Sequence, residues 1–185
     1  MSFVDDLALA RALATGDEAA FRVFVEQQTA PVFRICYRIL GRVDEAEDAA
    51  QETFVLAYRA LATFRGDGPA GAWVARIATR ECWRRSSSRA RRLAATQPLD
   101  DFLGATLADP ADPAREVVAA EERLAVRRAV AALPEPYREV VALRFFGDLS
   151  LADIASATGR PEGTVKAQLH RGLERLRNGM RMVPA

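Results

Sequence analysis

The chain has 185 residues, half of them hydrophobic, and its 26 basic and 25 acidic side chains leave a formal net charge of +1. That length suits one ordinary domain or two small ones, while two cysteines and one histidine exclude a disulfide framework and a zinc site of ordinary spacing. No apolar run approaches the roughly 20 residues that span a bilayer, and Asp5 and Asp6 make the N-terminus unlike a secretory signal. We therefore expect a cytoplasmic protein with no membrane insertion and no metal.

The charge is segregated along the chain although the total is close to zero. The net charge is −3 over residues 1–78, +5 over 79–92, −6 over 93–122, +1 over 123–157 and +4 over 158–185. Two basic blocks separated by an acidic stretch indicate two contact points for anionic partners, joined by a linker.

Helical periodicity dominates the N-terminal part. Asp17 is placed to cap a first helix. A second helix is expected to follow Pro31 and to end at Gly41, since proline favours the first helical turn and glycine the position after the last. The pattern predicts a third, longer helix from Asp44 to Ala62, with acidic residues in its first turns where the helix dipole favours them.

A glycine-rich loop, residues 65–71, follows this helix. The next predicted helix runs from Trp73 to Arg85 and carries several arginines on its polar side. From Ser86 to about Ala114 three serines, several prolines and four aspartates break the helical pattern, which is typical of a flexible linker.

Helical spacing returns at Glu116 and continues, with interruptions, to at least Leu176. Ser150 is placed to cap a short helix that ends at Gly159, and Pro161 opens the final helix. No strand pattern of comparable quality is present. The sequence therefore predicts an all-α protein, with two small helical domains joined by a flexible linker.

The segment from Ser150 to Leu176 has the layout of a helix-turn-helix. Val165, Leu169 and Leu173 lie on one stripe of the final helix, and the opposite face carries hydrogen-bonding and basic side chains. Such a helix can pack on its leucines and present the other face to a DNA major groove. An ordinary amphipathic surface helix with solvated arginines is the alternative that spacing alone leaves open.

The C-terminal segment Leu133–Arg177 reads LPEPYREVVALRFFGDLSLADIASATGRPEGTVKAQLHRGLERLR. It resembles region four of bacterial RNA polymerase sigma factors, which implies that it reads the −35 promoter element. Seven residues are expected to contact this element: Arg144, Thr164, Lys166, Ala167, Gln168, His170 and Arg171. Many members have Arg-Ser-Arg where this chain has Lys166-Ala167-Gln168, so the resemblance implies the role but not the recognised sequence.

The N-terminal half is independently similar to sigma region two. The motifs are GDEAAF from Gly16, DEAEDAAQETFVLAYRAL from Asp44, FRGDG from Phe64 and AWVARIA from Ala72. Their order and spacing are those of the extracytoplasmic-function (ECF) group of the sigma-70 family. The resemblance implies region two over residues 1–92, a linker over 93–115 and region four over 116–185.

By the same resemblance, the long acidic helix docks on the clamp of the polymerase β′ subunit, and the next loop and helix handle the −10 element. The polymerase-binding residues are expected to be Asp48, Gln51, Glu52 and Phe54. The −10 residues are expected to be Phe64, Arg65, Gly66, Asp67, Trp73, Arg76, Arg80 and Arg84. For single residues the alternatives stay open: a solvated acidic face with Phe54 in the core, and a Trp73 that holds the helices together.

The −10 segment departs from the family pattern at Ala70, Arg80 and Arg84, where relatives usually have an aromatic residue, Asn and Asp. We hypothesise that Arg80 occupies the base-capturing position and alters −10 specificity. The acidic linker is either a soluble tether or a segment that keeps the free chain from binding DNA prematurely.

The resemblance implies a non-enzymatic initiation factor without cofactors. Its implied partners are core RNA polymerase, promoter DNA and, commonly in the family, an anti-sigma factor. Two alternatives are a stand-alone helix-turn-helix regulator and a sigma-like adaptor that binds polymerase without melting DNA.

Overall fold

The computed structural model describes residues 3–64, 66, 68–95 and 113–181, and within them it contains only helices, turns and loops. The helices are α1 (Phe3–Ala14), α2 (Glu18–Leu40), α3 (Val43–Ala60), the short 3-10 helix η1 (Leu61–Thr63), α4 (Ala70–Ala95), α5 (Pro113–Ala131), α6 (Tyr137–Phe145), α7 (Leu151–Thr158) and α8 (Glu162–Arg181). The all-α prediction is confirmed. In this part of the chain no helix combines the length and the apolarity needed to cross a membrane.

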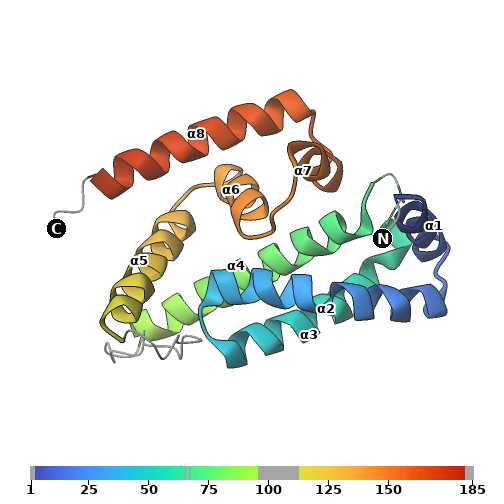
Figure 1. Ribbon diagram of the computed structural model, residues 1–185, viewed down its shortest axis with the longest axis horizontal. Helices are drawn as coiled ribbons and strands as arrows, with labels where there is room; N and C mark the ends of the chain where they lie inside the picture. Colours follow the sequence, from blue (N-terminus) through green and yellow to red (C-terminus); the bar gives the residue numbers. More distant parts are fainter. Residues whose placement is uncertain (1–2, 65, 67, 96–112, 182–185) are drawn as a thin grey trace.

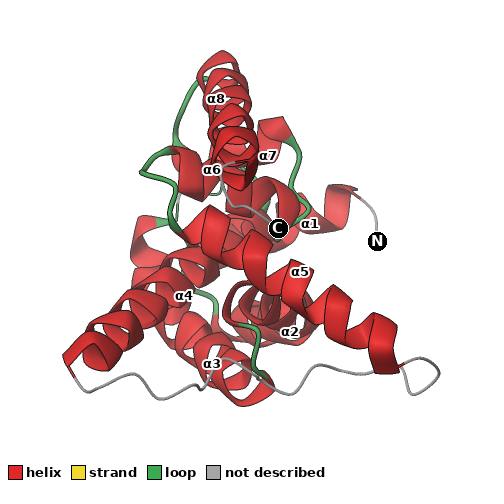
Figure 2. Cartoon of the chain, turned by 90° about the vertical axis from the view of Figure 1, so that its left-hand side faces the viewer, coloured by secondary structure: helices red, strands yellow, loops and turns green. Residues whose placement is uncertain are grey.

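The helices form two layers (Figure 1). Helices α2, α3 and α4 lie side by side with α1 across one end, and we call this the N-terminal layer. The C-terminal layer consists of α5 at the opposite end and of α6, α7 and α8 above α4. Helix α8 is the outermost element of the upper layer, and α3 lies on the far side of the lower one, as the side view also shows (Figure 2). The two layers meet where α4 packs against α6 and α7.

Helix α2 differs from its prediction because it is continuous through Pro31. Its ends are as expected: the Asp17 carboxylate accepts hydrogen bonds from the backbone N–H groups of Ala19 and Ala20, and Gly41 ends the helix with a φ of 80°. The prediction of a separate helix after Pro31 is wrong. Proline removes one internal hydrogen bond, but the buried side chains before and after it share one face that packs on α3 and α4. Tertiary packing therefore carries the helix past the proline.

Helix α4 also runs further than predicted. The expected break at Ser86 is wrong, because the helix continues through the three serines to Ala95. Arginines on both sides of the serines fasten the extension: Arg85 donates to Glu81 one turn earlier, and Arg89 forms an ion pair with Glu45 of α3. Serine is only weakly unfavourable inside a helix, so these contacts are sufficient to outweigh it.

Each layer has its own buried side chains. Phe24, Leu13 and Val74 are fully buried in the N-terminal layer, and Leu143 and Val165 in the C-terminal layer. Cys36 and Cys82 are free thiols buried in the N-terminal layer. The neighbouring Cys36 and the apolar surroundings both raise the pKa of Cys82, so this thiol stays protonated and acts as a small apolar side chain.

The helix-turn-helix has the predicted local structure. Ser150 and Asp153 form a reciprocal capping box at the start of α7, and Gly159 ends this helix with a φ of 67°. Helix α8 approaches α6 closely at Gly172, where an added Cβ would lie 2.8 Å from the Val141 Cγ2 atom. Glycine at this position therefore fixes the distance between α6 and the helix that carries the predicted reading face.

Candidate nucleic-acid interface

Helix α8 exposes the side chains that the sequence predicts as its reading face. Val165 is fully buried and faces the core of the C-terminal layer. Of the predicted −35 residues on the opposite face, Gln168 is half-buried and the others are exposed: Thr164, Lys166, Ala167, His170 and Arg171. The Gln168 side-chain oxygen lies 3.4 Å from the guanidinium of Arg160. Figure 2 shows that this helix forms an outer edge of the molecule, where a DNA groove can reach it.

Arg144, the remaining predicted −35 residue, lies at the end of α6. Its side chain is exposed and donates a hydrogen bond of 2.8 Å to the carbonyl of Leu149 in the loop before α7. It thus braces the loop from which the helix-turn-helix begins.

Two of the predicted −10 residues belong to an aromatic cluster inside the N-terminal layer. Phe64 is buried and its ring centroid lies 4.8 Å from that of half-buried Trp73, which in turn lies 6.3 Å from Phe24. The structure therefore places Trp73 where it joins α4 to α2. Gly66 adopts a φ of 72° in the loop between η1 and α4, whereas Arg65 and Asp67 lie outside the described residues.

Arg76 and Arg80 of α4 point to the C-terminal layer, where they meet Glu139 of α6. Arg76 donates to one Glu139 carboxylate oxygen at 2.9 Å and Arg80 to the same oxygen at 3.1 Å. Arg160, in the turn of the helix-turn-helix, donates to the other oxygen at 2.5 Å. We call these four residues the Glu139 cluster. Burial alone would raise the pKa of Glu139, but the hydrogen bond and charge of Arg76, with the charges of Arg160 and Arg80, hold this pKa below its ordinary value.

Arg84, the next predicted −10 residue along α4, is held within its own helix. It makes two hydrogen bonds of 2.7 Å to the buried carboxylate of Glu81, which also accepts from Arg85 at 2.6 Å. Burial opposes the ionisation of Glu81, but the two arginines outweigh it and lower its pKa. The guanidinium of Arg84 remains largely exposed and can still face a phosphate.

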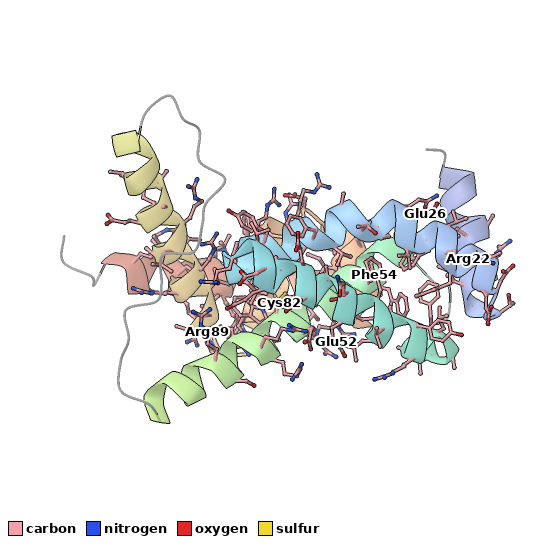
Figure 3. All side chains as sticks on the ribbon, turned by 90° about the horizontal axis from the view of Figure 1, so that it is seen from below. Arg22, Glu26, Glu52, Phe54, Cys82 and Arg89 are labelled. Carbon is pink, nitrogen blue, oxygen red and sulfur yellow. The ribbon has the colours of Figure 1, made fainter. Side chains whose placement is uncertain are left out.

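The predicted polymerase-binding residues lie on α3, away from the C-terminal layer. Asp48 and Gln51 are exposed, while Glu52 is half-buried. Phe54 is half-buried and packs against the hydrophobic core. Figure 3, the view from below, shows Glu52 and Phe54 on this helix on the side opposite α6–α8. The three polar residues form one accessible patch that a basic surface can contact.

The buried carboxylates of Glu81 and Glu139 lead us to expect that the protein loses stability in acid. Because their arginine partners lower the pKa values of Glu81 and Glu139 from 4.5, the stabilisation is present above about pH 4.5 and is lost as the pH falls through the depressed values. We expect the free energy of unfolding, measured by urea titration, to decrease from pH 5 to pH 3. The Glu81→Gln variant should lose less stability over this range than the wild type, and an equal loss would contradict the prediction.

Sequence reasoning missed Glu139, Arg160 and Glu81 as parts of this region. Glu139 occurs one turn before the buried Leu143 and next to Val140, so its place on the apolar side of α6 was a usable signal. Its partners were not predictable, because Arg76 and Arg80 are 63 and 59 residues away along the chain.

Comparison with known proteins assigns the two layers. Residues 24–92 match the family model of sigma-70 region 2, and residues 123–176 match that of sigma-70 region 4. The chain is 34% identical over 175 residues to the ECF RNA polymerase sigma factor SigW of Bacillus subtilis, which covers 90% of this chain and 91% of that protein. The chain belongs to the ECF sigma factors. It therefore serves promoter recognition in transcription initiation, and its two layers contain sigma regions 2 and 4.

Further sigma-factor relatives agree over nearly the full length. The RNA polymerase sigma-H factor of Pseudomonas aeruginosa is 33% identical over 174 residues, 91% of this chain and 90% of that protein. The ECF sigma-E factor of Escherichia coli strain K12 is 30% identical over 178 residues, 94% and 93% of the two chains. Sigma factors of this kind are initiation factors rather than catalysts.

A solved structure shares the fold of this ECF sigma factor. CnrH in complex with the cytosolic domain of CnrY superimposes with a TM-score of 0.60 at 22% identity, over 97% of this chain and 99% of that chain. The sigma factor RpoE of Bartonella quintana, in complex with the anti-sigma factor NepR, gives a TM-score of 0.55 at 20% identity. The match covers 89% of this chain and 98% of that chain.

Proposed function

We propose that the surfaces of this ECF sigma factor divide the work of initiation between them. Region 2, residues 1–92, binds core polymerase through α3 and the −10 element through α4. Region 4, residues 116–185, binds the −35 element through α8. Residues 93–115 link the two regions. The observation that carries this proposal is that the predicted reading face of α8 and the acidic patch of α3 are both exposed, on opposite sides of the molecule. The factor acts in the cytoplasm without catalysis of its own, since polymerase supplies the chemistry.

At the −35 element, helix α8 enters the major groove with its exposed face. Arg171 and Lys166 have the length and charge to reach guanine edges or phosphates, and Gln168 suits adenine. Arg144 and Thr164 stand beside them. The buried side of α8 packs on α6 and α7, which holds the reading face at a fixed angle to the groove.

At the −10 element, α4 provides the cations that follow the separated strand. Arg76, Arg80 and Arg84 lie on successive turns of one helix, and such a row tracks a phosphate backbone while a loop captures a base. The loop before α4, with Phe64 at its base, is the proposed site of this capture. Trp73 supports the loop from inside through its contact with Phe64.

Two protein partners follow from the same proposal. Core polymerase docks on Asp48, Gln51 and Glu52 of α3, whose acidic side chains complement a basic surface. Phe54 packs against the hydrophobic core and so anchors this helix. A protein inhibitor is the second proposed partner, because the structures of CnrH and of the Bartonella protein each contain a bound protein, which for the Bartonella protein is named an anti-sigma factor.

The decisive experiment is reconstitution of the full chain with core polymerase on a library of promoter fragments, followed by sequencing of transcript 5′ ends. We expect starts at discrete sites that share two conserved elements upstream. Binding to polymerase without discrete starts would instead indicate an adaptor, and DNA binding without polymerase binding would indicate a stand-alone regulator.

Arg171 provides a sharper test of the −35 assignment. We expect Arg171→Ala to reduce discrimination at one −35 position by about 1–3 kcal/mol, because a bidentate base contact is lost. The measurement is transcription by the reconstituted holoenzyme from templates with every base at each −35 position. Uniform weakening on all templates would show that Arg171 contacts a phosphate instead.

A further inference from the structure

We propose that the free sigma factor holds itself closed by an internal anion, Glu139, which occupies the arginines that region 2 needs for the −10 strand. This inference rests on the proposed role of Arg76 and Arg80 in DNA binding. The closed state is that of the chain before it binds polymerase, and its contacts lie at the junction of the two layers.

The geometry of Glu139 is that of a bound anion rather than of a surface acid. Glu139 is only 4% exposed. Arginines of α4 donate to one of its carboxylate oxygens, and Arg160 of the helix-turn-helix donates to the other. Arg76 is fixed twice, because its second guanidinium nitrogen donates to the carbonyl of Ala157 at 2.9 Å. Its side chain is 24% exposed, so it is withdrawn from a DNA strand.

A second group of contacts closes the same junction. Arg38 of α2 pairs with Asp148, in the loop between α6 and α7, at 2.5 Å and donates to the carbonyl of Phe146 at 2.9 Å. The loop before α4 is covered as well: a Cβ added at Gly68 would lie 1.8 Å from the Ser156 Oγ atom of α7. Gly68 of the proposed −10 loop and the arginines Arg76 and Arg80 therefore all face region 4.

A phosphate and a carboxylate compete for the same guanidinium groups. Arg80 is 62% exposed. A cavity of about 420 Å³ beside the cluster is lined by four arginines and two glutamates, Arg80, Arg84, Arg138, Arg160, Glu135 and Glu139. A DNA strand can therefore approach Arg80 first, but it gains Arg76 only when Glu139 leaves. Gln168 of α8 contacts Arg160 of the cluster, but Thr164, Lys166, Ala167, His170 and Arg171 are exposed. Closure therefore masks the −10 surface and leaves most of the −35 surface accessible.

The test measures binding of the free, full-length chain to a fluorescent single-stranded DNA of mixed sequence by anisotropy at low salt. We expect Glu139→Gln to bind about tenfold more tightly than wild type, because the neutral amide no longer competes with phosphate for the arginines. The control is Glu26→Gln, which removes the same charge from an exposed position on α2 and should change affinity by less than about twofold.

A third variant shows which group is released. Adding Arg76→Ala to Glu139→Gln should remove most of the gain, since Arg76 is the arginine that closure withdraws. Equal affinities of Glu139→Gln and wild type, with both folded by circular dichroism, would overturn the proposal. So would a gain that the Glu26→Gln control reproduces.

Closure itself is tested without altering a DNA-binding group. Asp148→Asn keeps a residue that tolerates the φ of 55° at this position but removes the charge paired with Arg38. Fluorescence energy transfer between dyes on regions 2 and 4 should fall in this variant. Unchanged transfer in Asp148→Asn and Glu139→Gln alike would show that these contacts do not hold the layers together.

Holoenzyme transcription separates this inference from the proposed function. If wild-type holoenzyme starts at discrete promoters while Glu139→Gln leaves free-chain DNA binding unchanged, only the closure is wrong. If wild-type holoenzyme produces no discrete starts, the proposed function fails, whatever the dyes report about closure.

Discussion

Replacing Phe24 with alanine is expected to destabilise region 2 by about 3–5 kcal/mol, the usual cost of deleting a buried aromatic side chain. Phe24 is fully buried and its ring is in contact distance of both Phe21 and Trp73. The substitution would therefore also remove ring contacts from the aromatic cluster that supports the proposed −10 loop. Urea unfolding followed by circular dichroism measures the change, and transcription should fall in parallel at temperatures where the variant unfolds.

The neighbouring Val23 supplies the matched control for Phe24. It stands on the same helix but is 45% exposed, so Val23→Ala should cost less than about 0.5 kcal/mol. If both variants lose a similar amount of stability, the packing of α2 against α4 differs from that described.

Reversing two charges on α3, as Asp48→Lys with Glu52→Lys, is expected to weaken binding to core polymerase by about 100-fold or more. Like charges brought together across an interface cost several kcal/mol, and these two side chains lie four residues apart on one helical face. The measurement is competition with a fluorescently labelled wild-type chain for core polymerase, with circular dichroism to verify the helical content.

Glu26→Lys is the control for this charge reversal. Glu26 is an exposed acid of the same region, but Figure 3 shows it on α2, apart from the patch on α3. A single reversal there should change polymerase affinity by only a few-fold through long-range charge. If the α3 double variant retained wild-type affinity, the acidic patch would not be the docking surface.

The local features of this fold were predictable because their causes are local. Asp17, Gly41, Ser150 and Gly159 act within a few residues of themselves through capping hydrogen bonds and positive φ angles. The sequence therefore indicated where α2 and α7 begin or end, and the exposed face of α8 followed from the spacing of its leucines.

The errors arose where distant contacts decide. Pro31 and Ser86 interrupt a helical pattern, but packing on α3 and the ion pair of Arg89 with Glu45 keep the helices continuous. The Glu139 cluster joins residues that are about 60 positions apart. Charge counting placed Arg80 in a basic block, and the family resemblance assigned Arg76 and Arg80 to the −10 helix. Neither could reveal the carboxylate that partly neutralises them.

The position of α3 has a consequence for the order of events. Because this helix lies on the side of region 2 that faces away from region 4, its acidic patch is equally accessible whether the junction is shut or open. Polymerase would thus be able to capture the compact chain directly, and promoter strands would come second. A factor built in this way would bind separated strands poorly before it is loaded, while its −35 surface stays open to duplex DNA.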